Sequence, residues 1–80
     1  MKINVGSVVK ANAGRDGGGL FLVVATEGSY CFIANGKSRK LAKPKRKNMK
    51  HLSPTDSMID INDITDKQLR IRLRQLSDAE

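Results

Sequence analysis

Apolar residues in the first half of the chain fall into short runs that are separated by turn-forming residues. Residues 7–13 form one run that is compatible with a β-strand, and residues 20–26 form a second run that carries no charge. A third run covers residues 29–34. Runs of this length that are rich in branched and aromatic side chains favour strands over helices. The hydrophobic pattern therefore predicts a small, mainly β domain.

Glycine-containing segments separate these runs and predict the turns between them. Residues 14–19 contain four glycines and predict a loop rather than a regular element. Residues 27–28, Glu-Gly, predict a two-residue turn between the second and third strands. Residues 35–36, Asn-Gly, predict a type I′ hairpin turn, after which residues 37–41 would run back along the third strand.

The two predicted turns determine which side chains share a face of the sheet, because side chains alternate between faces along a strand. Counting back from the turns places Val24 opposite Cys31 and Leu22 opposite Ile33. One face would carry Leu20, Leu22, Val24, Cys31 and Ile33. The other would carry Phe21, Val23, Ala25, Tyr30 and Phe32. So small a sheet with two apolar faces must curl into a barrel or have its second face covered.

The C-terminal part of the chain predicts one helix, at about residues 66–77. Thr65 and Gln68 match a capping box, in which each side chain bonds the backbone N–H of the other residue. Three leucines recur at helical spacing, at positions 69, 73 and 76, and would dock on the face of Phe21 and Val23. Another side of the helix would carry Lys67, Arg70 and Arg74. The apolar residues between positions 58 and 64 are an alternative cover for that face, and a loose tail whose acids keep the protein soluble is the competing interpretation.

Charge divides the chain near residue 54. Residues 1–54 hold 11 Lys and Arg but 2 Asp and Glu, whereas residues 55–80 hold 4 and 6. The break coincides with residues 53–57, a cluster of turn formers. The expected organisation is therefore a basic β module over residues 1–54 and a separate tail, with the helix, over residues 55–80.

The segment 37–50 is the outstanding feature of the charge pattern, since it holds eight cations and no acid. Its self-repulsion would be relieved by a phosphate backbone, and each neutralised phosphate also releases counterions. A solvated surface loop is the alternative. Pro44 interrupts any helix here, so the segment is not a basic helix that reads a DNA groove. The candidate phosphate-binding residues are Arg15, Lys37, Arg39, Lys40, Lys43, Lys45, Arg46, Lys47 and Lys50.

Other chemistry has few candidates. Cys31 is the single cysteine, so no internal disulfide can form, which favours an intracellular protein. One cysteine and one histidine, His51, are too few to build a metal site, and no acid pair accompanies the histidine for acid–base catalysis. No stretch has the roughly 20 apolar residues that span a bilayer, and residues 1–6 lack the apolar core of a signal peptide. We therefore expect a monomeric, non-catalytic protein without a cofactor or a membrane partner.

The segment from Val5 to Val24 resembles the KOW motif, in which a strand, a glycine loop with a basic residue and an apolar strand follow one another. The Asn-Gly turn and the Lys-Pro-Lys-Arg-Lys run at residues 43–47 extend the match, so that residues 5–55 are similar to stand-alone bacterial KOW-domain RNA-binding proteins. The motif often has a basic residue before its last glycine, where this chain has Gly18. Arg15 is thus the loop's one cation, and the 37–50 run is the better binding candidate.

The resemblance implies an SH3-like (KOW-type) barrel that binds ribosomal RNA or another structured RNA in the cytoplasm, with ribosomal proteins as possible neighbours. Charge and composition on their own predict only a nucleic-acid partner. Two alternatives remain open at this point: a module that binds proteins, and a DNA-binding accessory factor of transcription.

Overall fold

The computed structural model describes residues 3–12 and 18–78 of the chain. In this part of the chain the strands are β1 (Ser7–Ala11), β2 (Leu20–Glu27), β3 (Tyr30–Ala34), β4 (Lys45–Asn48) and β5 (Leu52–Met58), followed by the helix α1 (Asp66–Asp78). A short 3-10 helix, η1 (Met49–His51), joins β4 to β5. The mainly β fold with a C-terminal helix, predicted from the hydrophobic pattern, is confirmed.

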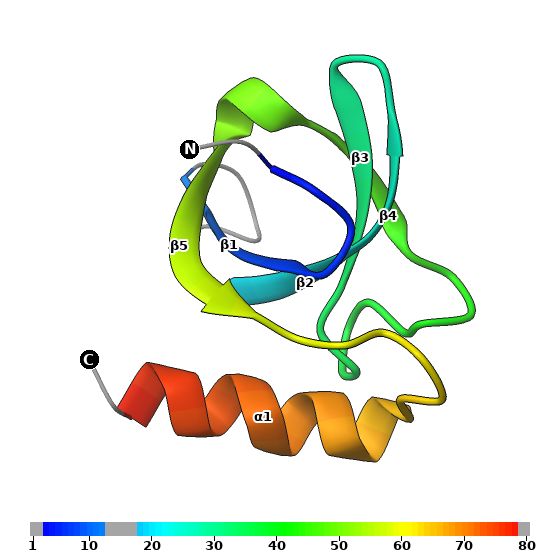
Figure 1. Cartoon of the computed structure of the whole chain (residues 1–80), viewed down its shortest axis with the longest axis vertical. Coiled ribbons are helices and arrows are strands. Elements are labelled where there is room, and N and C mark those ends of the chain that lie inside the picture. Colours follow the sequence, from blue (N-terminus) through cyan, green and yellow to red (C-terminus); the bar gives the residue numbers. More distant parts are fainter. Residues whose placement is uncertain (1–2, 13–17, 79–80) are drawn as a thin grey trace.

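All strand pairs are antiparallel, and the sheet has the order β4-β3-β2-β1-β5. The sheet curls around an interior, and α1 lies across one end of it (Figure 1). The two edge strands, β4 and β5, are consecutive in the chain, so η1 carries the chain from one edge of the sheet to the other (Figure 1).

The turn between β2 and β3 lies one residue later than predicted. Glu27 pairs with Tyr30, so the two loop residues are Gly28 and Ser29 rather than Glu27 and Gly28. Gly28 has a φ of 58° at the first loop position, which is the conformation that a type II′ hairpin turn requires and that glycine adopts without strain. The predicted pairing of Val24 with Cys31 is wrong, because Cys31 lies opposite Thr26.

The faces of the sheet are also assigned differently from the prediction, and the cause is a β-bulge. The one-residue shift of the turn would keep the predicted faces, because it moves the register by an even number. A register irregularity between Val23 and Ala25 then reverses them, so that Val23 pairs with Ile33. As a result Cys31 and Ile33 pack with Phe21 and Val23 instead of with Leu22.

The predicted hairpin at residues 35–36 does not form. Among the described residues Asp63 is the one non-glycine residue with positive φ, so Asn35 lacks the conformation of a type I′ turn. Its side-chain Oδ1 instead accepts hydrogen bonds from the backbone N–H groups of Lys37 (2.9 Å) and Arg39 (3.0 Å), which turns the chain away from the sheet. Residues 37–44 are therefore a connection and do not run back along β3, which pairs instead with β4, where Phe32 lies opposite Arg46.

The predicted turn at residues 53–57 is wrong as well, since these residues belong to β5 and pair with β1. Pro54 has no backbone N–H, but β5 is an edge strand, where proline is tolerated. The sheet thus extends to Met58, beyond the composition break at residue 54.

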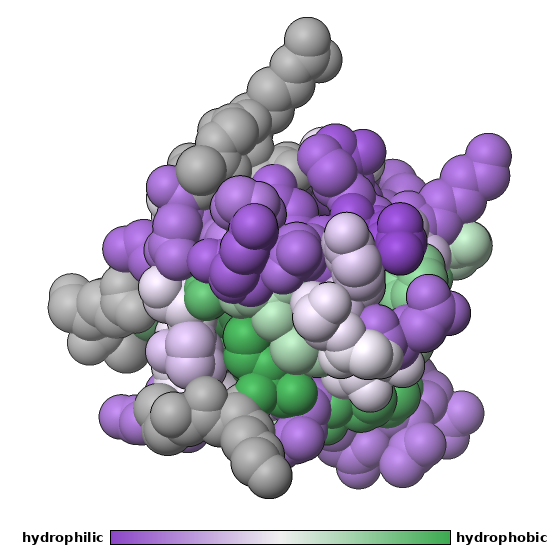
Figure 2. Space-filling view, turned by 90° about the horizontal axis from the view of Figure 1, so that it is seen from above, coloured by the Kyte–Doolittle hydropathy of each residue, from purple (hydrophilic) through white to green (hydrophobic). Residues whose placement is uncertain are grey.

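Two apolar clusters hold the fold together. The interior of the curled sheet contains Val9, Ala11, Phe21, Val23, Cys31, Ile33 and Leu52. The second cluster lies between the sheet and α1 and contains Val8, Leu22, Ala34, Ile59, Leu69 and Leu73. Ile3 and Met49 are partly buried and pack against the interior cluster. The end of the molecule away from α1 exposes a central hydrophobic patch with hydrophilic residues around it (Figure 2).

The helix forms and docks as its sequence predicts, but on the other face of the sheet. Gln68 N–H donates to Thr65 Oγ1 and Thr65 N–H donates to Gln68 Oε1, both at 3.1 Å, which confirms the capping box. Leu69 and Leu73 are buried against Leu22, not against the face of Phe21 and Val23. The segment before the helix supplies part of the same cover, since Ile59 is buried in this cluster. Both segments therefore cover the sheet, but on the face of Leu22 and not on the predicted face.

The docked helix allows a matched test of apolar burial on one element. Leu69 is fully buried, whereas Ile71 is 47% exposed. Leu69→Ala should lower the free energy of unfolding by about 2–5 kcal/mol, because a cavity replaces packed methyl groups. Ile71→Ala should lower it by less than about 1 kcal/mol. Urea denaturation of both variants checks this, and equal losses would mean that α1 does not dock through Leu69.

Gly36 makes the closest contact between the sheet connections and α1. A β-carbon at this position would collide with the backbone carbonyl oxygen of Asp66 and would lie 3.0 Å from Cγ of Arg70. Gly36 also has a φ of 78°. The lack of room beside α1 and the positive φ therefore both exclude a side chain at position 36. The Asn-Gly pair predicted glycine here for a different reason, a type I′ hairpin turn.

Gly18 provides a matched control for this position. Its φ of 85° is equally unfavourable for a side chain, but an added β-carbon would meet nothing within 4 Å. Gly18→Ala should cost about 1 kcal/mol of stability from the backbone alone. Gly36→Ala should lower the free energy of unfolding by about 1–3 kcal/mol more than Gly18→Ala does, because the helix must move away from the new methyl group. Thermal and urea unfolding of the two variants measure the difference, and similar losses would contradict the close packing.

Candidate nucleic-acid interface

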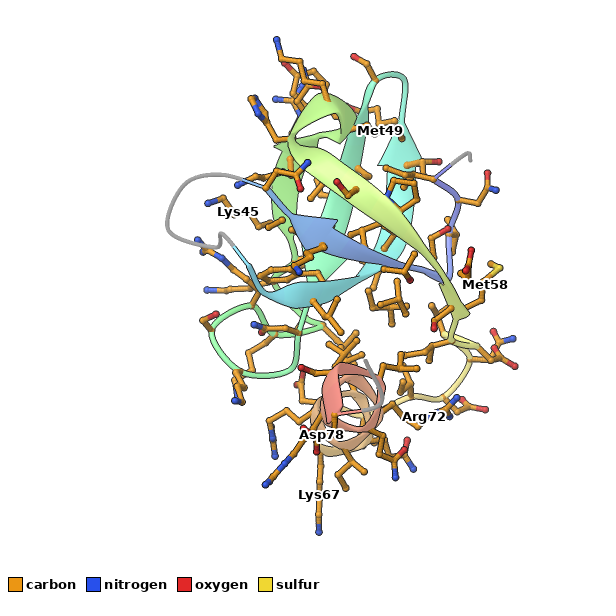
Figure 3. All side chains as sticks on the ribbon, turned by 90° about the vertical axis from the view of Figure 1, so that its left-hand side faces the viewer. Lys45, Met49, Met58, Lys67, Arg72 and Asp78 are labelled. Atoms are coloured by element: carbon orange, nitrogen blue, oxygen red, sulfur yellow. The ribbon has the colours of Figure 1, made fainter. Side chains whose placement is uncertain are left out.

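The basic run folds along one side of the molecule, as the 37–44 connection, the edge strand β4 and η1. We call its exposed cations the basic edge; these are Lys37, Lys40, Lys43, Arg46 and Lys50. Arg39, Lys45 and Lys47 are half-buried. Figure 3 shows Lys45 on one side of the molecule and Met58 and Arg72 on the other. Of the eight cations that the sequence predicted in the 37–50 run, the structure exposes these five to solvent.

Arg46 is oriented by an aromatic ring. Its guanidinium carbon lies 3.8 Å from the centroid of the Tyr30 ring, which is a cation–π contact across the β3–β4 pair. The contact places the guanidinium over one face of the ring. Arg46 is nevertheless exposed, so its edge can meet a phosphate.

Two side chains of the helix bind backbone groups of the connection that carries Lys37. The carbonyl oxygen of Gly36 accepts a hydrogen bond from Nη1 of Arg70 at 2.7 Å. The backbone N–H of Leu41 donates to Oδ1 of Asp66 at 2.9 Å. These bonds join both ends of the 36–41 segment to the first turns of α1, so Lys37 lies beside the basic stripe of the helix.

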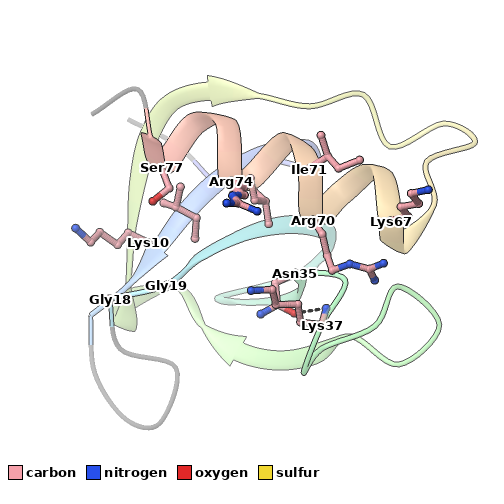
Figure 4. Close-up of a pocket in the computed structure, with 12 residues that line it drawn as sticks. Lys10, Gly18, Gly19, Asn35, Lys37, Lys67, Arg70, Ile71, Arg74 and Ser77 are labelled. Carbon is pink, nitrogen blue, oxygen red and sulfur yellow. Dashed lines mark hydrogen bonds between the residues drawn. The ribbon is translucent and has the colours of Figure 1, made fainter.

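A groove of about 760 Å³ runs between α1 and the loops of the sheet, and we call it the helix groove. In Figure 4 the helix forms one side, and the segments with Gly18-Gly19 and Asn35–Lys37 form the other. Five cations line it: Lys10, Lys37, Lys67, Arg70 and Arg74. No Asp or Glu is among its described lining residues, and its apolar surface comes from Leu20, Ile71 and Leu73.

The helix groove joins residues that the sequence reasoning treated separately. Lys67, Arg70 and Arg74 were predicted as a stripe from their helical spacing, and Lys37 as part of the basic run. Lys10 was not a candidate, because nothing in the local sequence places a single lysine of β1 near the C-terminal helix. Arg15, the cation of the glycine loop, lies outside the described residues.

Cys31 is a buried core residue, whereas His51 is an exposed surface residue. Cys31 is fully buried in the interior cluster, and burial raises the pKa of its thiol, which disfavours the reactive thiolate. His51 is exposed in η1 beside Lys50. Within residues 3–12 and 18–78, no three His, Cys, Asp or Glu side chains gather in a way that could hold a metal ion. The same residues include no helix with the length and apolar character to cross a membrane.

No protein-family model matches the chain, and no curated protein is significantly similar to it.

The burial of the one cysteine gives a direct test of the interior cluster. Iodoacetamide should alkylate Cys31 in the folded protein more than about tenfold slower than in the same protein unfolded in urea. The buried thiol must first be exposed by opening of the sheet, and its raised pKa lowers the thiolate fraction further. Mass spectrometry follows the reaction at one site, because the chain has one cysteine. Similar rates in the two states would contradict the burial.

Proposed function

We propose that this chain is a non-catalytic RNA-binding protein that holds the phosphate backbone of a structured RNA on its basic surface. The observation that carries the proposal is the convergence of two sets of cations that are distant in sequence. The basic edge follows β4 and its flanking segments, and the helix groove adds cations from β1 and α1. Lys37 belongs to both sets, so the two areas are continuous.

The electrostatics of this surface favour a polyanion. Exposed like charges that lie near one another repel, by about 1 kcal/mol or less for each pair in water. A phosphate backbone converts the repulsion into attraction and releases the condensed counterions of the nucleic acid.

The choice of RNA rather than DNA follows the resemblance of residues 5–55 to KOW-domain proteins, and the curled five-stranded sheet is consistent with the SH3-like barrel of that family. The resemblance further implies ribosomal RNA, a cytoplasmic location and ribosomal proteins as neighbours. Competition between a structured RNA and duplex DNA at one salt concentration separates this proposal from a DNA-binding accessory factor.

One observation favours a second candidate function, a protein-binding module. The end of the molecule away from α1 shows a hydrophobic patch (Figure 2), and a hollow is lined by the apolar Ile3, Met49, Leu52 and Pro54 together with the polar Asn4, Thr26 and Lys50. A protein partner on this hollow would bind through apolar contact, and its affinity would change little with salt. RNA binding at the basic edge would weaken steeply with salt.

Salt dependence tests the proposed function. If the five cations of the basic edge each contact one phosphate, the logarithm of the affinity should fall with the logarithm of salt concentration at a slope of about −3.5 to −4.5. The triple variant Lys43→Gln/Arg46→Gln/Lys50→Gln removes three of these contacts from exposed positions. Its slope should be shallower by roughly 2 to 3. Fluorescence anisotropy with a hairpin RNA measures both slopes.

Arg72→Gln is the control for this experiment, because Arg72 is exposed on the side of the molecule away from Lys45 (Figure 3). Its slope should equal that of the wild type. Circular dichroism confirms that all variants are folded. A folded triple variant that keeps the wild-type slope would move the binding surface away from the basic edge.

A further inference from the structure

We propose that the helix groove binds a single-stranded segment of RNA, so that α1 forms one wall of a second RNA-binding site beside the basic edge. The inference rests on the proposed function and adds to it the chemistry of a site. The ligand is a flexible phosphodiester strand rather than the surface of a duplex.

The charge of the groove is the first argument. Its five cations come from β1, the 37–44 connection and α1, and no acidic side chain among the described lining residues offsets them. The helix has two carboxylates, those of Asp66 and Asp78, and neither is part of the lining; that of Asp66 accepts a hydrogen bond from Leu41 N–H. Folding therefore concentrates positive charge around a concave space, where a bound anion is attracted from several sides.

The placement of the arginines is the second argument. The bond from Arg70 Nη1 to the Gly36 carbonyl uses one N–H group and holds the guanidinium at the wall of the groove. A guanidinium has five N–H donors in a planar fork, a geometry that suits phosphate oxygens. Arg74 follows one helical turn later and is exposed into the same groove (Figure 4). The two arginines thus follow one another along the helix axis, and a nucleic-acid strand lying in the groove parallel to α1 would meet both.

The size of the groove selects a single strand. The whole molecule measures 27 × 26 × 23 Å, which is little wider than a nucleic-acid duplex, and the groove occupies only part of one side. A duplex cannot enter it and would instead contact a convex surface such as the basic edge. The volume of about 760 Å³ is within the usual range of about 300–1,000 Å³ for ligand pockets.

The walls of the groove suit a nucleotide. Gly18 and Gly19 have no side chains, so a strand can approach the backbone there closely. Leu20, Ile71 and Leu73 provide apolar surface on which a base can pack while its phosphate meets the cations. Proteins that bind single strands without sequence preference combine these two features, a positive groove and surfaces for the bases.

Two substitutions on α1 form the critical comparison, because each removes one arginine charge from an exposed position of the same helix. Arg74 lines the groove, whereas Arg72 lies in a different depression with Asp60 and Asn62. Binding of a labelled oligouridylate, which stays single-stranded, is measured by fluorescence anisotropy. Arg74→Gln should weaken it roughly tenfold and reduce the salt slope by about 0.7. Arg72→Gln should leave both unchanged.

An NMR titration of the wild-type protein locates the site independently of affinity. Oligouridylate should shift the backbone amide signals of Gly18, Gly19 and Lys37, and Arg74→Gln should reduce these shifts. Lys67→Gln, at the other end of the groove, is a second variant with the same expected loss of affinity. Melting curves establish that each variant is folded.

The outcomes separate the inference from the proposed function. If the wild type binds a hairpin RNA with a steep salt dependence but binds no oligouridylate, the groove is not a single-strand site and the proposed function stands. Equal losses for Arg74→Gln and Arg72→Gln, or amide shifts confined to β4, overturn the inference in the same way. If neither RNA binds, the proposed function itself fails.

Discussion

The contact between Gly36 and the first turn of α1 is the constraint on which the arrangement of the molecule depends. On one side the absent β-carbon lets the backbone approach the carbonyl of Asp66, and on the other the Gly36 carbonyl accepts a bond from Arg70. The Asp66 carboxylate also accepts a hydrogen bond from Leu41 N–H, so two side chains of the helix hold backbone groups of the connection. The close approach at Gly36 and these two bonds together position Lys37 relative to the helix cations.

Apolar burial provides the free energy that holds these charges together. Docking of α1 buries Leu69 and Leu73, and each such side chain contributes about 1.5–3 kcal/mol. The same docking brings three cations of the helix beside Lys10 and Lys37, but exposed pairs in water interact by about 1 kcal/mol or less. The leucines therefore outweigh the repulsion. The fold can therefore keep a surface on which like charges repel one another, because apolar burial elsewhere leaves it stable enough to do so.

The elements that could be predicted from the sequence are those with local signals. The helix has its capping box and leucine spacing, and three strands coincide with apolar runs. The register could not be predicted, because a bulge near Val24 leaves no mark in an apolar run and yet exchanges the faces. The strand β4 has only polar residues, Lys-Arg-Lys-Asn, and it exists because its backbone pairs with β3. For the candidate site, the basic run and the helix stripe were visible in the sequence. The position of Lys10 beside them could not be predicted from the sequence, since it depends on the curl of the sheet and the position of α1.

The basic residues of β4 have a second physical role that must be separated from binding. Edge strands expose unpaired backbone groups, and lysines on an edge discourage pairing with another chain. This role is sufficient to explain a few cations on β4, which is an edge of the sheet. It does not explain Lys67, Arg70 and Arg74, because a helix has no edge to protect. Nor does it explain Lys10, since β1 is paired on both sides. Edge protection thus does not account for the grouping of cations in the helix groove, and this grouping is the observation on which the proposed single-strand site rests.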